Sequence, residues 1–181
     1  DYLPVDESHP IRPLCPYGVS KHTVEHYLSI YNRQYGLNFT TLRYANVYGP
    51  RQDPFGEAGV VAIFAQRMLH GAQAVINGAG DQERDFVYVE DYARANVMAL
   101  TGGSAGTFNL ASGRGTSVNE IFRTMAKLTN YQLPEVHGPA KPGEVFRIFL
   151  SYDLARRELG WAPRVELEDG LKRTVAYFAS V

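Results

Sequence analysis

A long helix followed by a strand is encoded in YGVSKHTVEHYLSIYNRQYGLNFTTLRYANVYGP, residues 17–50. Residues 17–35 contain one glycine and no proline, and Gly36 supplies a common C-terminal stop, so this part predicts one helix. Residues 39–44 are β-branched and aromatic and run into a turn at 46–50, which predicts a buried strand. Because α/β enzymes place chemistry in loops at strand ends, this turn is a candidate site.

The rest of the chain continues to alternate strands and helices. Strands are expected near 74–76, 86–89, 107–111 and 145–150, and helices near 59–70, 90–100, 117–129, 152–159 and 167–179. The helix at 117 is marked by Ser117-Val118-Asn119-Glu120, which matches a capping box. This order predicts an α/β fold rather than a β-sandwich or a helical bundle.

The composition is that of a globular protein with a hydrophobic core. The chain has 181 residues, 45% of them hydrophobic, and a formal charge of -1 from 18 basic and 19 acidic side chains. This balance provides no basic field for nucleic acid or an anionic membrane, and no apolar segment is long enough to span a bilayer. The single Cys15 permits no internal disulfide and fits a reducing cytoplasm. We therefore expect a cytoplasmic enzyme that acts on a small molecule.

Two motifs with different chemistry share the first helix. Tyr17 and Lys21 are four residues apart, so they lie on one helix face, where the ammonium stabilises a phenolate that can act as a general base. His22-Thr23-Val24-Glu25-His26 matches H-x-x-E-H, a zinc-binding pattern. No later carboxylate offers a recognisable third ligand, so we expect no metal and interpret the two histidines as a polar flank. Glycine-rich dinucleotide loops, P-loops and C-x-x-C pairs are absent from the sequence.

Six sequence blocks, taken together, resemble one family. They are PYGVSK (16–21), LRYANVYGPR (42–51), RDFVYVED (84–91), FNLASG (108–113), PGE (142–144) and ELGW (158–161). Their order over essentially the whole chain resembles the NAD-dependent epimerase/dehydratase family, the extended short-chain dehydrogenases. The resemblance implies NAD as the cofactor and epimerisation of a UDP-sugar at C4, of the UDP-glucose/UDP-galactose type.

The resemblance also implies a domain organisation. The fold would be the C-terminal part of a Rossmann-like doubly wound parallel sheet plus a small α/β substrate-binding domain. Residues 1–50 would end the NAD-binding domain, and residues 51–181 would mainly bind the nucleotide-sugar, with a strand near 107–111 returning to the Rossmann sheet. In the family the glycine-rich loop precedes this region, so we expect the isolated chain neither to bind NAD tightly nor to turn over.

Three residues would form the catalytic and cofactor end of the site. The resemblance makes Tyr17 the base that takes the proton from the sugar 4-hydroxyl, and Lys21 the residue that holds the nicotinamide ribose. Tyr44 would line the nicotinamide pocket, with a packed strand aromatic as the alternative.

The nucleotide-sugar would be held by residues from several loops and strands. Arg84 matches the arginine that grips the diphosphate, a task suited to its planar fork. Lys141 stands where many relatives carry a second arginine, which keeps the charge but loses the fork. Asn46 would contact the nucleotide-sugar, or alternatively form a turn.

The remaining substrate contacts have equally good structural alternatives. Val75 and Ile76 fall where the family sandwiches the uracil, and an ordinary half-buried strand explains them as well. Glu144 would reach a ribose hydroxyl or stabilise its loop. Ile148 would lie on the wall of the sugar pocket.

Other functions stay open at this stage. Nucleotide-sugar 4,6-dehydratases and decarboxylases share these blocks, because the acid that separates them lies upstream in the family. A homodimer through the helix that begins near Tyr17 is expected. A non-enzymatic remnant that self-associates through unpartnered apolar surface is the alternative from a different class.

Overall fold

The computed structural model describes residues 1–55, 59–102, 106–141 and 143–181. Its helices are α1 (Pro16–Tyr35), α2 (Val60–Leu69), α3 (Val89–Thr101), α4 (Val118–Leu128) and α5 (Leu167–Phe178), with a π-helical segment, η1 (Ala155–Leu159). Its strands are β1 (Thr40–Tyr44), β2 (Asn46–Tyr48), β3 (Val75–Asn77), β4 (Glu83–Arg84), β5 (Phe86–Tyr88), β6 (Gly106–Leu110), β7 (Thr116–Ser117) and β8 (Val136–Gly138). None of these helices is long and apolar enough to cross a membrane.

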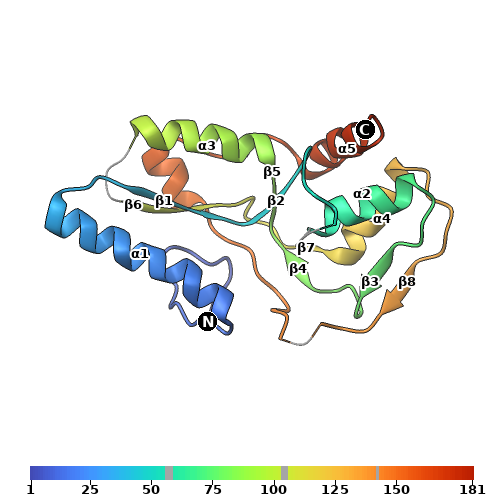
Figure 1. Cartoon of the computed structure of the whole chain (residues 1–181), viewed down its shortest axis with the longest axis horizontal. Coiled ribbons are helices and arrows are strands. Elements are labelled where there is room, and N and C mark those ends of the chain that lie inside the picture. The colour runs from blue at the N-terminus through green and yellow to red at the C-terminus, as the bar shows by residue number, and fades with distance from the viewer. Residues whose placement is uncertain (56–58, 103–105, 142) are drawn as a thin grey trace.

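The strands pair mainly in parallel. β1 pairs with β6, β2 with β5 and β3 with β8 in parallel, whereas β4 and β7 form a short antiparallel pair. Figure 1 shows α1 and α3 on opposite sides of the β1–β6 pair, while α2, α4 and α5 gather at the other end of the molecule. The expected α/β architecture with parallel strands is confirmed.

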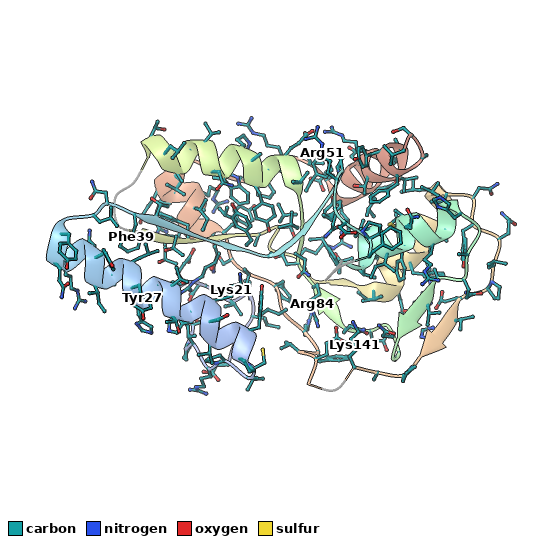
Figure 2. The ribbon with its side chains drawn as sticks, in the orientation of Figure 1. Lys21, Tyr27, Phe39, Arg51, Arg84 and Lys141 are labelled. Atoms are coloured by element: carbon teal, nitrogen blue, oxygen red, sulfur yellow. The ribbon has the colours of Figure 1, made fainter. Side chains whose placement is uncertain are left out.

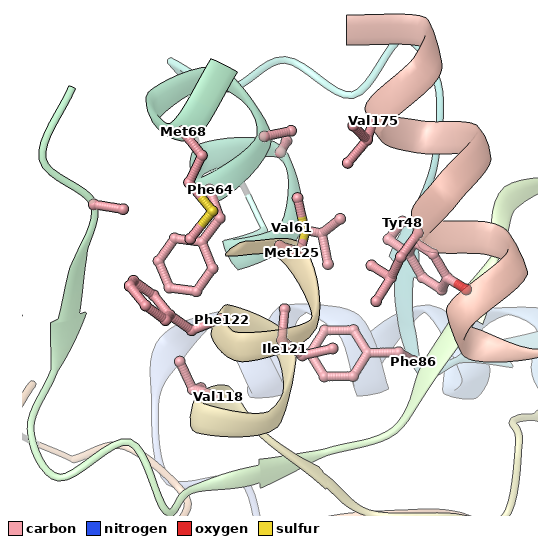
Figure 3. Packing of buried hydrophobic residues seen from close by; sticks show 14 of the residues in the cluster. Tyr48, Val61, Phe64, Met68, Phe86, Val118, Ile121, Phe122, Met125 and Val175 are labelled. Atoms are coloured by element: carbon pink, nitrogen blue, oxygen red, sulfur yellow. The ribbon is translucent and has the colours of Figure 1, made fainter. Parts of the chain in front are cut away.

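Two hydrophobic clusters hold the elements together. One joins α2, α4 and α5 through buried side chains that include Phe64, Ile121 and Met125 (Figure 3). The other packs α3, β6 and η1 around the fully buried Trp161, whose indole nitrogen donates to the Asp91 carbonyl at 2.9 Å.

Close packing of α5 on β2 depends on a glycine. A Cβ at Gly170 would lie 2.1 Å from the Tyr48 hydroxyl oxygen, which in the structure donates to the Leu167 carbonyl at 3.2 Å. Any larger residue at this position would force the helix away from the strand.

Four local expectations need correction. The strand at 40–44 was expected to be buried, whereas each of its residues is partly or well exposed. Residues 145–150 do not form a regular strand, because they pair only at isolated bridges, Val5 with Leu150 and Glu83 with Arg147. The expected helix at 152–159 is largely the π-helical η1. β8 lies in a proline-rich stretch for which the sequence predicts only a loop.

Among the helices that the structure describes, α1 alone has no buried residue. It ends at Gly36, which takes the left-handed conformation at φ +67°, and none of its residues is buried. A two-pronged ion pair attaches it to β1, since Arg43 Nε and an Arg43 terminal nitrogen each donate to the Glu25 carboxylate at 2.7 Å. These hydrogen bonds hold the pKa of Glu25 below its ordinary value, and burial opposes them.

The Glu25–Arg43 pair predicts a pH-dependent stability. Glu25→Gln is expected to lower the free energy of unfolding by about 1–2 kcal/mol near neutral pH, since it removes a charge-assisted pair. A lowered carboxyl pKa contributes stability that is present above its unfolded value of 4.5 and is lost as the pH falls through the folded value, so the difference between variant and wild type shrinks in acid.

Urea unfolding followed by circular dichroism at neutral pH and in acid measures this. Glu168→Gln is the matched control, because Glu168 forms only an exposed pair with Lys172. It should change stability by less than about 0.5 kcal/mol. Equal stability of Glu25→Gln and the wild type at neutral pH would contradict the role of the pair.

Candidate functional site

One end of the candidate site lies between α1 and β1. A cavity of about 480 Å³ is lined by Tyr17, Lys21 and Glu25 from the helix and by Tyr44 among the β1 residues. The Lys21 ammonium stands 5.2 Å from the centroid of the Tyr17 ring. The helical spacing therefore does bring a phenol and a fixed cation to one open cavity, with the Tyr17 side chain well exposed.

Tyr44 is held in place by α3. Its ring centroid lies 4.2 Å from that of the buried Tyr92, and the Asn96 amide donates a short hydrogen bond to its hydroxyl. Sequence reasoning missed Asn96, because its link to Tyr44 spans 52 residues. Tyr44 thus packs on a helix and also lines the cavity, and its contact with a nicotinamide stays a prediction.

A second cavity, of about 320 Å³, adjoins the first. Tyr17 and Tyr44 line both, and Asn46 and Ile148 also line the second. Asn46 is placed by β2, where its backbone nitrogen donates to the Asp85 carbonyl at 2.8 Å. The end of β1 and the start of β2 therefore carry polar side chains to one place, as expected for strand ends in a parallel sheet.

The other end of the site is cationic. A third cavity, of about 240 Å³, is lined by Asn46, Arg84, Lys141 and Glu144, among others. Arg84 donates to the Glu83 carbonyl at 2.8 Å and to the Glu144 carboxylate at 2.9 Å, which orients its guanidinium. Figure 2 shows Lys21, Arg84 and Lys141 following one another from α1 towards β8.

Val75 and Ile76, the two candidate residues on β3, point to opposite faces of the strand. Val75 and Asn77 line the cavity with Arg84, whereas Ile76 is fully buried in the core cluster. Because successive strand residues point to opposite faces, a strand that presents Val75 and Asn77 must bury Ile76. The Ile76 side chain thus packs in the core, as the alternative of an ordinary half-buried strand predicts, and a contact of Ile76 with the uracil stays a prediction.

A buried carboxylate fixes the junction of these cavities. Asp85, only 2% exposed, accepts hydrogen bonds from the backbone nitrogens of Ser112, Gly113 and Leu150 and from the Ser112 hydroxyl, at 2.6–3.2 Å. Burial raises the pKa of Asp85, and these hydrogen bonds oppose that rise. No role was assigned to Asp85 from the sequence. A carboxylate that directly precedes an apolar run is, however, a sign of a buried and hydrogen-bonded charge.

The residues of the H-x-x-E-H pattern on α1 contact other side chains of the protein. Glu25 forms the ion pair with Arg43, and the rings of His22 and His26 lie edge to face with centroids 4.4 Å apart. Among the residues that the structure describes, no group of three or more His, Cys, Asp or Glu side chains is placed to hold a metal ion. Arg43, the ion-pair partner of Glu25, lies 18 positions further along the chain. The H-x-x-E-H motif alone therefore could not show that Glu25 is used in an ion pair.

The three adjoining cavities are here called the groove. The parallel strand pairs with helices on both sides, and the groove beside them, define an α/β protein of the Rossmann type. The sequence profile of the NAD dependent epimerase/dehydratase family matches residues 2–111, and the chain belongs to that family.

Individual relatives narrow the comparison. The UDP-glucose 4-epimerase of Thermotoga maritima, solved with UDP-glucose, is 48% identical with a TM-score of 0.98, over 99% of this chain and 58% of its own. The Thermus thermophilus UDP-glucose 4-epimerase, solved with NAD, is 43% identical with a TM-score of 0.88, over 95% and 56%. A dTDP-glucose 4,6-dehydratase of Streptomyces niveus is 31% identical over 96% of this chain and 51% of its own. The chain thus spans little more than half the length of these relatives.

The Asp85 hydrogen bonds predict a strong effect of a single-atom change. Asp85→Asn replaces an acceptor by an amide that faces backbone donors, so the free energy of unfolding should fall by about 2–3 kcal/mol. Hydrogen exchange of the Ser112 and Leu150 amides should accelerate at the same time. Asp153→Asn, at an exposed carboxylate that pairs with Arg156, is the control and should change little. Wild-type stability in Asp85→Asn would refute the role of the carboxylate.

Proposed function

We propose that this chain carries the general base and the nucleotide-sugar grip of an enzyme that uses NAD to invert C4 of a UDP-sugar. One observation carries the proposal: the Tyr17–Lys21 cavity and the Arg84–Lys141 cavity adjoin a common middle cavity. A nucleotide-sugar has its reactive sugar at one end and its anionic diphosphate towards the other. A groove with a base at one end and cations at the other suits such a substrate.

The Tyr17 end fits part of NAD. The Lys21 ammonium and the Tyr17 phenol offer hydrogen-bond donors for ribose hydroxyls in an open cavity. When bound, NAD supplies the acceptor that takes a hydride from the sugar carbon and returns it to the other face. Both of these side chains would touch the cofactor or the substrate, so they are the proposed catalytic residues.

Side chains of this chain would transfer the proton and bind the diphosphate of the substrate. Tyr17, as the phenolate, accepts the proton of the C4 hydroxyl as the carbonyl forms, and returns it when the hydroxyl is restored. Lys21 stabilises the phenolate by its charge. Arg84 and Lys141 would hold the diphosphate while the keto-sugar turns to present its opposite face.

A related reaction is the second candidate. The family also contains dTDP-glucose 4,6-dehydratases at 31% identity to this chain. They would share the first oxidation at C4 and then eliminate water. The product separates the two: epimerisation of UDP-galactose yields UDP-glucose with no loss of mass, whereas dehydration yields a 4-keto-6-deoxy sugar nucleotide that is lighter by one water.

Removal of the Tyr17 hydroxyl tests the catalytic assignment. In the full-length parent enzyme, Tyr17→Phe should lower kcat for UDP-galactose by about 10²–10⁴-fold, because the base is lost, with KM nearly unchanged. Tyr27→Phe is the matched control on the same helix, since Tyr27 is exposed and does not line the cavity. Conversion of UDP-galactose at the wild-type rate by Tyr17→Phe would eliminate Tyr17 as the base.

We further propose that α1 mediates self-association. None of its residues is buried, and Tyr27, Tyr31 and Tyr35 are each at least half exposed. An apolar and aromatic surface of this kind on a 20-residue helix is suited to burial against a second copy.

Sedimentation velocity tests this association. The wild-type chain should sediment as a dimer, and Tyr31→Glu should shift it towards monomer because it places a charge in the contact. Leu100→Glu, at an exposed position on α3, is the control. A monomeric wild-type chain at high concentration would argue against this use of α1.

A further inference from the structure

Residues 143–150, here called the strap, bring two side chains to the groove. Glu144 lines the cavity with Arg84, and Ile148 lines the middle cavity with Tyr17. The strap is not a regular strand, so its position depends on individual contacts rather than on a continuous ladder of hydrogen bonds.

Val5 and Asp85 hold the end of the strap. The Val5 nitrogen donates to the Phe149 carbonyl at 2.9 Å, and the Leu150 nitrogen donates to the Asp85 carboxylate at 3.2 Å.

The middle of the strap is held by one residue of β4. The Glu83 backbone nitrogen donates to the Phe146 carbonyl at 2.9 Å, and the Ile148 nitrogen donates to the Glu83 carbonyl at 3.2 Å. The Arg147 guanidinium then pairs with the Glu83 carboxylate and lies 5.3 Å from the Phe149 ring centroid. Both the main chain and the side chain of Glu83 therefore hold the strap.

The absence of a side chain at position 115 makes this packing possible. A Cβ at Gly115 would lie 2.4 Å from Glu83 Oε2 and 2.9 Å from Phe149 Cδ1. The Glu83 carboxylate thus occupies space next to β7 that a side chain at position 115 would otherwise fill. From this place the carboxylate faces Arg147.

Two neighbouring residues of β4 form ion pairs of opposite sense with the strap. Glu83 pairs with Arg147, and Arg84 pairs with Glu144. The second pair lies in the cavity, where a bound diphosphate would compete with Glu144 for Arg84. The first pair lines none of the three cavities of the groove, so a ligand there leaves it intact.

We infer that Arg147 is a positioning residue of the nucleotide-sugar site, which holds the strap through Glu83 so that Glu144 and Ile148 stay at the groove when a diphosphate engages Arg84. The inference rests on the proposed function for its ligand. The contacts of Arg147 themselves do not depend on that ligand.

Calorimetric titration of the 181-residue chain with UDP tests the inference, alongside hydrogen exchange of the strap. Arg147→Gln should weaken UDP binding about three- to fivefold and accelerate exchange of the Ile148 amide. Arg147→Lys, which keeps the charge, should recover part of the loss. Adding Glu83→Gln to Arg147→Gln should weaken binding no further than either change alone, because both break one pair.

Arg156→Gln is the matched control. Arg156 forms an exposed ion pair with Asp153 and lies 5.9 Å from the centroid of the Tyr152 ring, and its side chain is 62% exposed against 54% for Arg147. It therefore reports what a merely structural pair of this kind contributes. Arg147→Gln should match it in global thermal stability and differ from it in UDP affinity and in strap exchange.

The possible results separate this inference from the proposed function. If Arg147→Gln binds UDP like Arg156→Gln and leaves strap exchange unchanged, the inference is overturned. If the wild-type chain does not bind UDP, the proposed substrate class is wrong. In that case faster strap exchange in Arg147→Gln still supports the role of Arg147, and unchanged exchange still overturns it.

Discussion

The buried carboxylate of Asp85 is held by donors from two separate parts of the chain. It lies between β4 and β5, and its acceptors are saturated by the turn after β6 and by the end of the strap. The Asp85 backbone carbonyl accepts a hydrogen bond from the backbone nitrogen of Asn46, and this bond positions the start of β2. An unpaired charge at this depth would be costly, so these segments must meet at one point. The middle cavity of the groove lies where they meet.

Packing and chemistry are distributed unevenly around that point. The cationic end of the groove, with Arg84 and Lys141, lies next to the hydrophobic cluster of α2, α4 and α5, in which large side chains are fully buried. The proposed base lies on α1, which buries no residue and is attached to β1 by the Glu25–Arg43 pair. The proposed nucleotide grip therefore adjoins the more densely packed part of the molecule. Tyr17 therefore lies on a helix that makes few packing contacts with the rest of the described residues.

The sequence predicted those features that local patterns determine. Gly36 marked the end of α1, and Ser117 does cap α4, accepting the Glu120 nitrogen at 3.1 Å. Residues 145–150 were wrongly expected to form a strand, because they have β propensity but find partners only at isolated positions. The sequence could not decide which of Val75 and Ile76 faces the cavity, because the alternation of strand side chains fixes the faces only once the buried side is known.

The features that long-range contacts determine could not be inferred in the same way. The partner of Glu25 is 18 residues away, and the donors to Asp85 are 27 to 65 residues away. No motif connects such positions. The family blocks located Tyr17, Lys21 and Arg84 by analogy, and only the structure shows that their cavities adjoin.

If the three cavities form one groove for one nucleotide-sugar, a crystal structure of the chain with UDP-glucose will show a single ligand spanning them. Diphosphate density is expected within about 3.5 Å of the Arg84 guanidinium, with the sugar extending past Asn46 towards Tyr17. Density for the nucleotide-sugar elsewhere, or a diphosphate that leaves Arg84 without contact, would contradict a single shared groove.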